Sequence, residues 1–479
     1  MAKRTIPAVN SNKYRNLQLL NINTVIRHGA RTPYTNYNCW AGYLESPENS
    51  RYDCTLHMLM SPKDNSDKVL FEKVYDALDP PLTNMLQGTC HVGQLLQAGY
   101  DQELLNGNHI RSAYFEVEST KNPLRLFRNS PLPVTSFDDL PPNSIRIRGD
   151  DQQRTLMSGQ VLLTGVIEFN DDSETTIIYH TADYGVDPIY PNSKICPKLR
   201  YLQENAESSA EFLSKNVTSL TQILVGEELQ FATWLDILDC QYTTKCNDRP
   251  LPSVLDYPDS FNDVEFQETS FNKINEHATW QLGFVYTHDN GAFAKLAMAP
   301  LLSDVLGSLR AAQNAPSQQA YLEVGNSVLN IHSGHDTTVM PVLAALGVWD
   351  GVWSPFASML LIESFSHDSG HVFRIVYNGA VLTGSFAGCE GEELCDLEIL
   401  INFLAEFALA DRDCVDPNAA ARARGSMNRN STAGVTWALI CVVMSTISSF
   451  ITWRMTKSSS NTPYSNMGED NDMVVDNNL

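Results

Sequence analysis

The feature that most constrains this chain is an apolar run that ends in a cluster of charge. Residues 17–26, rich in Leu, Ile and Val, predict a buried strand and lead directly into Arg27-His28-Gly29-Ala30-Arg31-Thr32-Pro33. Neighbouring cations keep a histidine neutral, so His28 is a poor base but can attack phosphorus. The arginines can hold phosphate oxygens through paired N–H groups. The cluster therefore predicts a phosphate site centred on His28.

A second cluster has the form expected of the same site. The predicted strand at 328–331 leads through a Ser-Gly turn into His335-Asp336-Thr337-Thr338, where a helix to about residue 346 is predicted. A phosphate there would meet free N–H groups and the positive end of the helix dipole. His335 can donate to a phosphate oxygen. Asp336 can protonate a leaving alkoxide and then accept a proton from water. Alone, such a pair is more often an N-cap, but beside the first cluster it indicates phosphate chemistry.

The order of apolar runs and helical segments predicts an α/β fold with a largely parallel sheet. The predicted strands lie at 17–26, 144–148, 175–180 and 328–331, with a final antiparallel set at 358–363, 372–377 and 380–382. Residues 199–309 contain no clear strand and predict a helical insertion packed on the sheet domain.

Two further segments complete a recognisable pattern. Residues 151–158 read DQQRTLMS and include Arg154, and residues 93–102 read GQLLQAGYDQ. Together with R-H-G-x-R-x-P and H-D, they resemble the histidine acid phosphatases, which include lysosomal and prostatic enzymes. That family has D-x-x-R-T-L-M-S and G-Q-L-T-x-x-G-x-x-Q at these places, so Leu96 replaces a threonine. The resemblance covers about residues 17–414.

The resemblance implies a phosphoglycerate-mutase-like α/β core with a mostly α-helical inserted cap domain, and hydrolysis of phosphate monoesters. His28 would be the nucleophile that forms a phosphohistidine, and Asp336 the general acid. Phosphate would be bound by Arg27, Arg31, Arg154 and His335, so no metal or other cofactor is implied. Activity should fall above neutral pH, because Asp336 must be protonated when substrate binds. The family also allows a homodimer.

The charge of the chain restricts its partners. Its 479 residues carry a net charge of −23. Nucleic-acid binding depends on many contacts between Lys or Arg and phosphate, so DNA and RNA are excluded as partners. An acidic surface also suits an acidic compartment, because it loses charge as the pH falls.

The ten cysteines are typical of an exported protein, with reduced structural cysteines as the alternative. Nine of them lie outside the apolar segment near the C-terminus, so at least one is expected to be unpaired or bonded to another chain. Close spacing predicts small disulfide loops at Cys240/Cys246 and Cys389/Cys395. The family resemblance supports Cys389/Cys395 and adds Cys196–Cys414.

The last part of the chain predicts a membrane anchor. Residues 433–453 are uncharged and mostly apolar, with Trp437 and Trp453 placed for the two interfaces. A buried core helix is the alternative. The predicted order is an N-terminal segment (1–15), the phosphatase domain (16–418, with the cap at about 199–309), a stalk (419–432), the transmembrane helix and a cytosolic tail (454–479).

The orientation of this anchor rests on the N-terminus. The first residues lack the apolar segment of a signal peptide, so either a leader is missing from the sequence or the protein is tail-anchored with a cytosolic body. The cysteines and the glycosylation sequons at Asn216 and Asn430 favour the first alternative. The catalytic domain is then expected to be lumenal or extracellular, in lysosomes or endosomes or at the cell surface.

Three alternatives remain from the sequence. One is a mutase or sugar phosphatase that shares the R-H-G start, although the H-D pair and the long insertion favour an acid phosphatase. Another is a phosphatase dedicated to one substrate, an inositol polyphosphate or a phosphorylated glycan. The third is a catalytically silent surface protein on this fold, which the presence of all six expected site residues disfavours.

Overall fold

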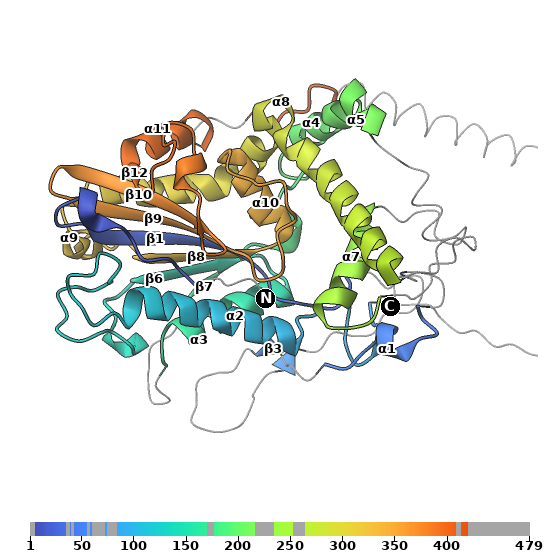
Figure 1. Ribbon diagram of the computed structural model, residues 1–479, viewed down its shortest axis with the longest axis horizontal. Helices are drawn as coiled ribbons and strands as arrows, with labels where there is room; N and C mark the ends of the chain where they lie inside the picture. Colours follow the sequence, from blue (N-terminus) through green and yellow to red (C-terminus); the bar gives the residue numbers. More distant parts are fainter. Residues whose placement is uncertain are drawn as a thin grey trace, which may run out of the picture. The chain divides into compact units, whose positions relative to one another are not determined.

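A single large sheet organises the domain. The computed structural model describes residues 5–34, 39, 43–54, 58–59, 72–73, 84–169, 177–215, 234–251, 264–408 and 413–419. The eight-stranded sheet has the order β11-β10-β9-β1-β8-β6-β7, with β12 paired to β10 (Figure 1). Its strands are β1 Gln18–Arg27, β6 Ile145–Gly149, β7 Tyr179–His180, β8 Leu329–Gly334, β9 Met359–His367, β10 Gly370–Tyr377, β11 Ala380–Val381 and β12 Cys395–Asp396. Two small pairs, β2 (Arg51–Tyr52) with β5 (Gln87–Gly88) and β3 (Met58–Leu59) with β4 (Glu72–Lys73), lie apart from it.

The sheet is mixed rather than largely parallel. Strands β1, β8, β6 and β7 are parallel, whereas β9 joins β1 antiparallel and continues into β10 and β11. The short turn between His367 and Gly370 forces the antiparallel arrangement, because a parallel connection needs a long crossover. The predicted final antiparallel set is confirmed, and it joins the parallel half directly at β1.

Helices cover both faces of the sheet, as Figure 1 shows. One core contains apolar side chains of α8, α10 and α11 against residues such as Val25 and Ile362. The other contains α2 and α3 against residues such as Ile22 and Ile147. The helices are α1 Pro47–Ser50, α2 Gln97–Ile110, α3 Gln153–Val166, α4 Lys198–Glu207, α5 Ala210–Lys215, α7 Trp234–Cys246, α8 Val264–Gln313, α9 Gln318–Glu323, α10 Asp336–Ala345 and α11 Leu397–Ala408. The predicted α/β core with a helical insertion is confirmed.

Helix α8 belongs to both parts of the domain. Its backbone leaves the helical conformation over His288–Gly291, where Asp289, Asn290 and Gly291 have positive φ. These residue types tolerate the left-handed region, so the chain bends there. The half after the bend packs on α10, α11 and the sheet. The predicted insertion at 199–309 therefore ends within a helix of the core, and the exact domain division stays a prediction.

Among the described residues, one helical stretch, Phe271–Gln313, is long and apolar enough to cross a membrane. Of its most apolar 18 residues, 56% are buried inside the domain. The bend at His288–Gly291 also interrupts the stretch Phe271–Gln313. We interpret it as a core helix. The predicted anchor at 433–453 and both sequons lie outside the described residues, so they stay predictions.

Four disulfides join the described cysteines, and one prediction about them is wrong. The bonds are Cys39–Cys240, Cys54–Cys90, Cys196–Cys414 and Cys389–Cys395, and Cys246 is free. Cys389–Cys395 and Cys196–Cys414 are thus confirmed. The loop predicted between Cys240 and Cys246 does not form, because both residues lie on helix α7, where six positions place them on different faces.

Candidate active site

The two charged motifs meet at one edge of the sheet. Strands β1 and β8 are parallel neighbours, and Arg27 lies opposite Gly334. The N–H of His28 donates to the carbonyl of Gly334 at 2.9 Å, so His28 and His335 both lie just beyond the paired strand ends. Their ring centroids are 5.4 Å apart. Ligand sites of open α/β sheets occur at such carboxyl ends of strands.

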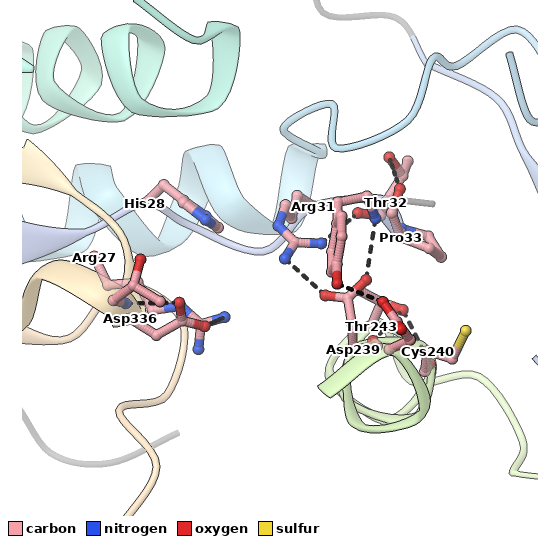
Figure 2. Close-up of polar contacts among 12 residues, drawn as sticks. Arg27, His28, Arg31, Thr32, Pro33, Asp239, Cys240, Thr243 and Asp336 are labelled. Carbon is pink, nitrogen blue, oxygen red and sulfur yellow. Dashed lines mark hydrogen bonds and ion pairs between the residues drawn. The ribbon is translucent and has the colours of Figure 1, made fainter. Parts of the chain in front are cut away.

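All six residues predicted for the site line one cavity of about 250 Å³. His28, Arg27 and Arg31 come from the end of β1 and the following turn, and Asp336 comes from the first turn of α10 (Figure 2). Arg154 comes from the first turn of α3. The cavity is lined in addition by Tyr34, Gln152, Tyr190, Leu235, Leu238, Asp239, Tyr242, Leu282, Thr337 and Trp353.

The surroundings of His28 keep its imidazole neutral. The side chain is 1% exposed, and burial lowers its pKa well below the usual value, with further lowering by Arg154, Arg31, His335 and Arg27. Nδ1 lies 2.9 Å from the carbonyl oxygen of Gly29, which can only accept. The proton is therefore on Nδ1, and Nε2 keeps a free lone pair.

Arg27 is held from several directions. It is 2% exposed, its Nη1 donates to the carbonyl of Ser354 at 2.5 Å, and its Nη2 lies 2.8 Å from Asp336. Its guanidinium lies 4.1 Å from the ring centroid of Phe356, a cation–π contact. Its Nε has no hydrogen-bond partner among the described residues. The guanidinium is thus fixed in position and keeps a donor unused.

Asp336 is ionised in the free protein. Burial raises its pKa, but Arg27, Arg31, His335 and the backbone N–H of Thr337 together lower it below the usual value. The Thr337 N–H donates to Oδ1 at 2.8 Å, and the side chain is 15% exposed at the cavity. A carboxyl in this position can become a proton donor only after a bound anion offsets the arginines.

His335 has a partner that the sequence did not indicate. Its Nε2 lies 3.0 Å from Oδ2 of Asp150, a fully buried carboxylate at the end of β6. Burial raises the pKa of Asp150, but His335, Thr155 and Arg154 lower it overall, so the carboxylate is ionised and accepts the Nε2 proton. A hydrogen bond from His335 to phosphate would therefore come from Nδ1, which carries a hydrogen only when the imidazole is protonated on both nitrogens.

The remaining motif residues fix the backbone around His28. Gly29 and Gly99 touch: a Cβ on Gly29 would lie 2.3 Å from the carbonyl oxygen of Gly99. The N–H of Gly29 donates to Ser158 Oγ at 3.1 Å, and the N–H of Ala30 donates to Gln102 Oε1 at 3.0 Å. The segments at 93–102 and 151–158 thus hold the turn that carries the histidine.

The four motifs, R-H-G-x-R-x-P, H-D and the segments at 93–102 and 151–158, thus meet around His28. The sequence profile of the family described as "Histidine phosphatase superfamily (branch 2)" matches residues 18–378, well over half of the chain. The chain belongs to this family.

Relatives of this histidine phosphatase include a counting factor and a lysophosphatidic acid phosphatase. "Counting factor 60" of Dictyostelium discoideum is 27% identical over 415 residues, covering 83% of this chain and 87% of that protein. "Lysophosphatidic acid phosphatase type 6" of Mus musculus is 25% identical over 415 residues, covering 82% and 86%. The solved phytase of Klebsiella sp ASR1 has a TM-score of 0.47 at 16% identity, covering 82% of this chain and 95% of that one.

Within this histidine phosphatase, the described residues contain no group of three or more His, Cys, Asp or Glu side chains arranged for a metal ion. The cavity instead gathers guanidinium groups around one neutral imidazole. Such an arrangement can bind a phosphate group and present a nitrogen nucleophile to its phosphorus.

Proposed function

We propose that this protein hydrolyses phosphate monoesters through a phosphohistidine on His28. The observation that carries the proposal is the state of that side chain: a neutral imidazole whose Nε2 is free, beside guanidinium groups that line the same cavity. Arg27, Arg31, Arg154 and His335 would bind the phosphate and stabilise the charge of the transition state. Asp336 would transfer protons on either side of the intermediate.

The proposed reaction has two displacements at phosphorus. His28 Nε2 attacks phosphorus, the ester P–O bond breaks, and the leaving oxygen takes a proton from Asp336. Water then attacks the phosphohistidine, Asp336 accepts its proton, and the P–N bond breaks to release inorganic phosphate. Asp336 must be protonated when the first step begins, which a bound phosphate promotes by competing for Arg27.

The decisive experiment is hydrolysis of p-nitrophenyl phosphate at pH 5 in the presence of EDTA, comparing wild type with His28→Ala. We expect EDTA-resistant turnover that falls on the order of 10⁴-fold or more in the variant. Asp336→Asn, with the same substrate, should accumulate an acid-labile phosphoryl group on His28, because the nitrophenolate leaves without a proton while the attack of water is slowed. Absence of turnover and of labelling in folded wild type would refute the proposal in favour of a silent protein on this fold.

We further propose that the alcohol part of the substrate is apolar. Beside the phosphate-binding groups, the cavity is lined by Leu235, Leu238, Tyr242, Leu282 and Trp353. Among the described lining residues, the only Lys or Arg side chains are Arg27, Arg31 and Arg154, so a second phosphate would meet apolar side chains. This favours a monophosphate of a lipid-like or aromatic alcohol over an inositol polyphosphate. The relative named for lysophosphatidic acid supports the same class.

Substrate preference can be measured with decyl phosphate, glycerol 3-phosphate and inositol hexakisphosphate. We expect kcat/KM for decyl phosphate to exceed that for glycerol 3-phosphate at least about ten-fold, because burial of two methylenes suffices for this ratio. Leu235→Asn should reduce the ratio. Leu213→Asn, on the exposed side of α5, should leave it unchanged. A preference for the hexakisphosphate would contradict the proposed class.

We also propose that the catalytic domain lies in an oxidising compartment, lumenal or extracellular, anchored through residues 433–453. The four disulfides support this location, because such bonds persist outside the cytosol. Expression of the full chain in cultured cells tests it. Glycosidase treatment should shift the wild-type protein and not an Asn216→Gln/Asn430→Gln variant, and truncation after residue 432 should release the protein from membranes. A protein confined to the cytosol would contradict the proposal.

A further inference from the structure

Three of the four groups proposed to bind phosphate are each paired with one carboxylate. The pairs are Arg27–Asp336, His335–Asp150 and Arg31–Asp239. The first two carboxylates lie at the carboxyl-terminal edge of the sheet, beside the residues that they hold. Asp239 instead comes from helix α7 of the helical insertion, more than 200 positions after Arg31 in the sequence.

Asp239 uses both of its oxygens on the segment that carries the R-H-G-x-R-x-P motif. Its Oδ1 accepts from Arg31 Nη2 at 2.7 Å, and its Oδ2 accepts from the backbone N–H of Tyr34 at 3.0 Å. Arg31 Nη1 donates to the carbonyl of Thr32 at 2.8 Å. The guanidinium is therefore held at two nitrogens, which fixes its plane, and Nε has no hydrogen-bond partner among the described residues. Figure 2 shows Asp239 facing Arg31 from α7.

Helix α7 is itself fastened to that segment. Cys240, next to Asp239, forms a disulfide with Cys39, and Asn247 Nδ2 donates to the carbonyl of Arg31 at 3.3 Å. The hydroxyl of Tyr34 donates to Asp236 at 2.7 Å. The carboxylate of Asp239 thus occupies a defined place relative to Arg31. The same face of α7 lines the cavity through Leu235, Leu238 and Tyr242.

Both partners are almost inaccessible, Arg31 at 5% and Asp239 at 9% exposure. A buried guanidinium that loses its carboxylate leaves an unpaired charge, so its side chain turns toward other acceptors. Burial lowers the pKa of Arg31, and Asp239 more than restores it. The insertion therefore contributes a carboxylate to Arg31 in addition to apolar side chains that line the cavity.

We propose that Asp239 is a positioning residue, contributed by the helical insertion, that orients Arg31 for phosphate binding. The inference rests on the proposed function, because it takes Arg31 as a ligand of the phosphate. It means that the phosphate-binding site is incomplete without α7. A carboxylate that merely competed with phosphate for Arg31 would instead weaken binding, and its removal would strengthen it.

The test is inhibition by inorganic phosphate at pH 5 in the full chain, with p-nitrophenyl phosphate as substrate. In Asp239→Asn the amide has one acceptor oxygen in place of two, and its NH₂ group can only donate. In this geometry it can therefore satisfy either Arg31 or the Tyr34 N–H but not both. We expect the Ki for phosphate and the KM to rise together by about 10- to 100-fold, the range for a misplaced catalytic group. Ki is set by active molecules alone, so partial unfolding of the variant does not change it.

Asp236→Asn is the matched control. It lies one turn earlier on α7, and its amide oxygen can still accept from the Tyr34 hydroxyl, so its Ki should change less than two-fold. An unchanged or lower Ki in Asp239→Asn would overturn the inference while leaving the proposed function intact. A folded wild type without turnover would instead refute the proposed function itself.

Discussion

Two of the buried arginine–carboxylate pairs at the sheet, Arg374–Glu363 and Arg27–Asp336, differ in what surrounds them. Arg374 on β10 and Glu363 on β9 form one pair, and both are 0% exposed. Arg374 bonds Glu363 through Nε and Nη2 and the carbonyl of Pro7 through Nη1, while the Tyr114 hydroxyl also donates to Glu363. Every nitrogen of the guanidinium has a partner, so this cluster is closed.

The pair of Arg27 and Asp336 is just as buried on the arginine side but opens on a cavity. Arg27 Nε keeps no partner among the described residues, and Asp336 is 15% exposed at the cavity. The first pair joins two adjacent strands, whereas the second joins a strand end to a helix start. A buried charge therefore does not by itself mark a site. Unused donors beside a cavity, at the carboxyl ends of parallel strands, are what distinguish it.

Asp336→Asn should have the largest effect of the changes considered, and the effect should be on activity rather than on stability. We expect kcat for an alkyl phosphate to fall by about 10² to 10⁴-fold, since general acid catalysis is lost, with little change in the melting temperature. Steady-state kinetics and thermal unfolding of the same preparation measure both. Unfolding of the variant at assay temperature would mean that the two pairs play the same structural role.

Glu363→Gln should show the opposite pattern. Breaking this closed pair leaves Arg374 buried without a full counter-charge, so the free energy of unfolding should drop by about 3–5 kcal/mol. The kcat of the molecules that remain folded should not change. Chemical denaturation measures the loss. Replacing the cluster with apolar residues (Tyr114→Phe, Glu363→Leu, Arg374→Met) should recover much of it, and a fall in kcat would contradict the purely structural assignment.

The pH dependence should separate free and substrate-bound states of Asp336. Its lowered pKa in the free protein means that kcat/KM falls as the pH rises from the acidic end of the range. Bound phosphate raises that pKa, so the fall in kcat should lie at higher pH. The ratio of kcat/KM in wild type to kcat/KM in Asp336→Asn, taken at each pH, isolates the titration of Asp336, because ionisation of the substrate is common to both proteins. A ratio that is flat between pH 5 and 8 would remove Asp336 as the acid.

Arg146→Gln should have the smallest effect and supplies an exposed pair for comparison. Arg146 lies 3.4 Å from Asp304, with side chains 35% and 46% exposed. Solvent screens such pairs, so the cost should stay below about 1 kcal/mol, and activity should not change. A larger loss in chemical denaturation would show that this pair contributes more than its exposure allows.

Much of the fold follows from local patterns. The strands predicted at 17–26, 144–148, 328–331, 358–363 and 372–377 are confirmed, because apolar β-branched runs form strands wherever they can be covered. Of the strand predicted at 175–180, residues 177–180 are described, and only Tyr179–His180 form a strand. The apolar pattern did not predict which strands pair with each other. Strand β9 lies beside β1 because of how the whole sheet is assembled.

The sequence alone predicted His28, its neighbouring arginines and the H-D pair as candidates for the site, because each lies next to a strand end and carries a local charge pattern. The partners of these residues depend on how the chain packs in three dimensions. Asp150, Asp239 and the Cys39–Cys240 bond join positions far apart along the chain. Adjacent residues share a backbone that limits where they can lie, whereas distant residues meet only after the helices and the sheet have packed together.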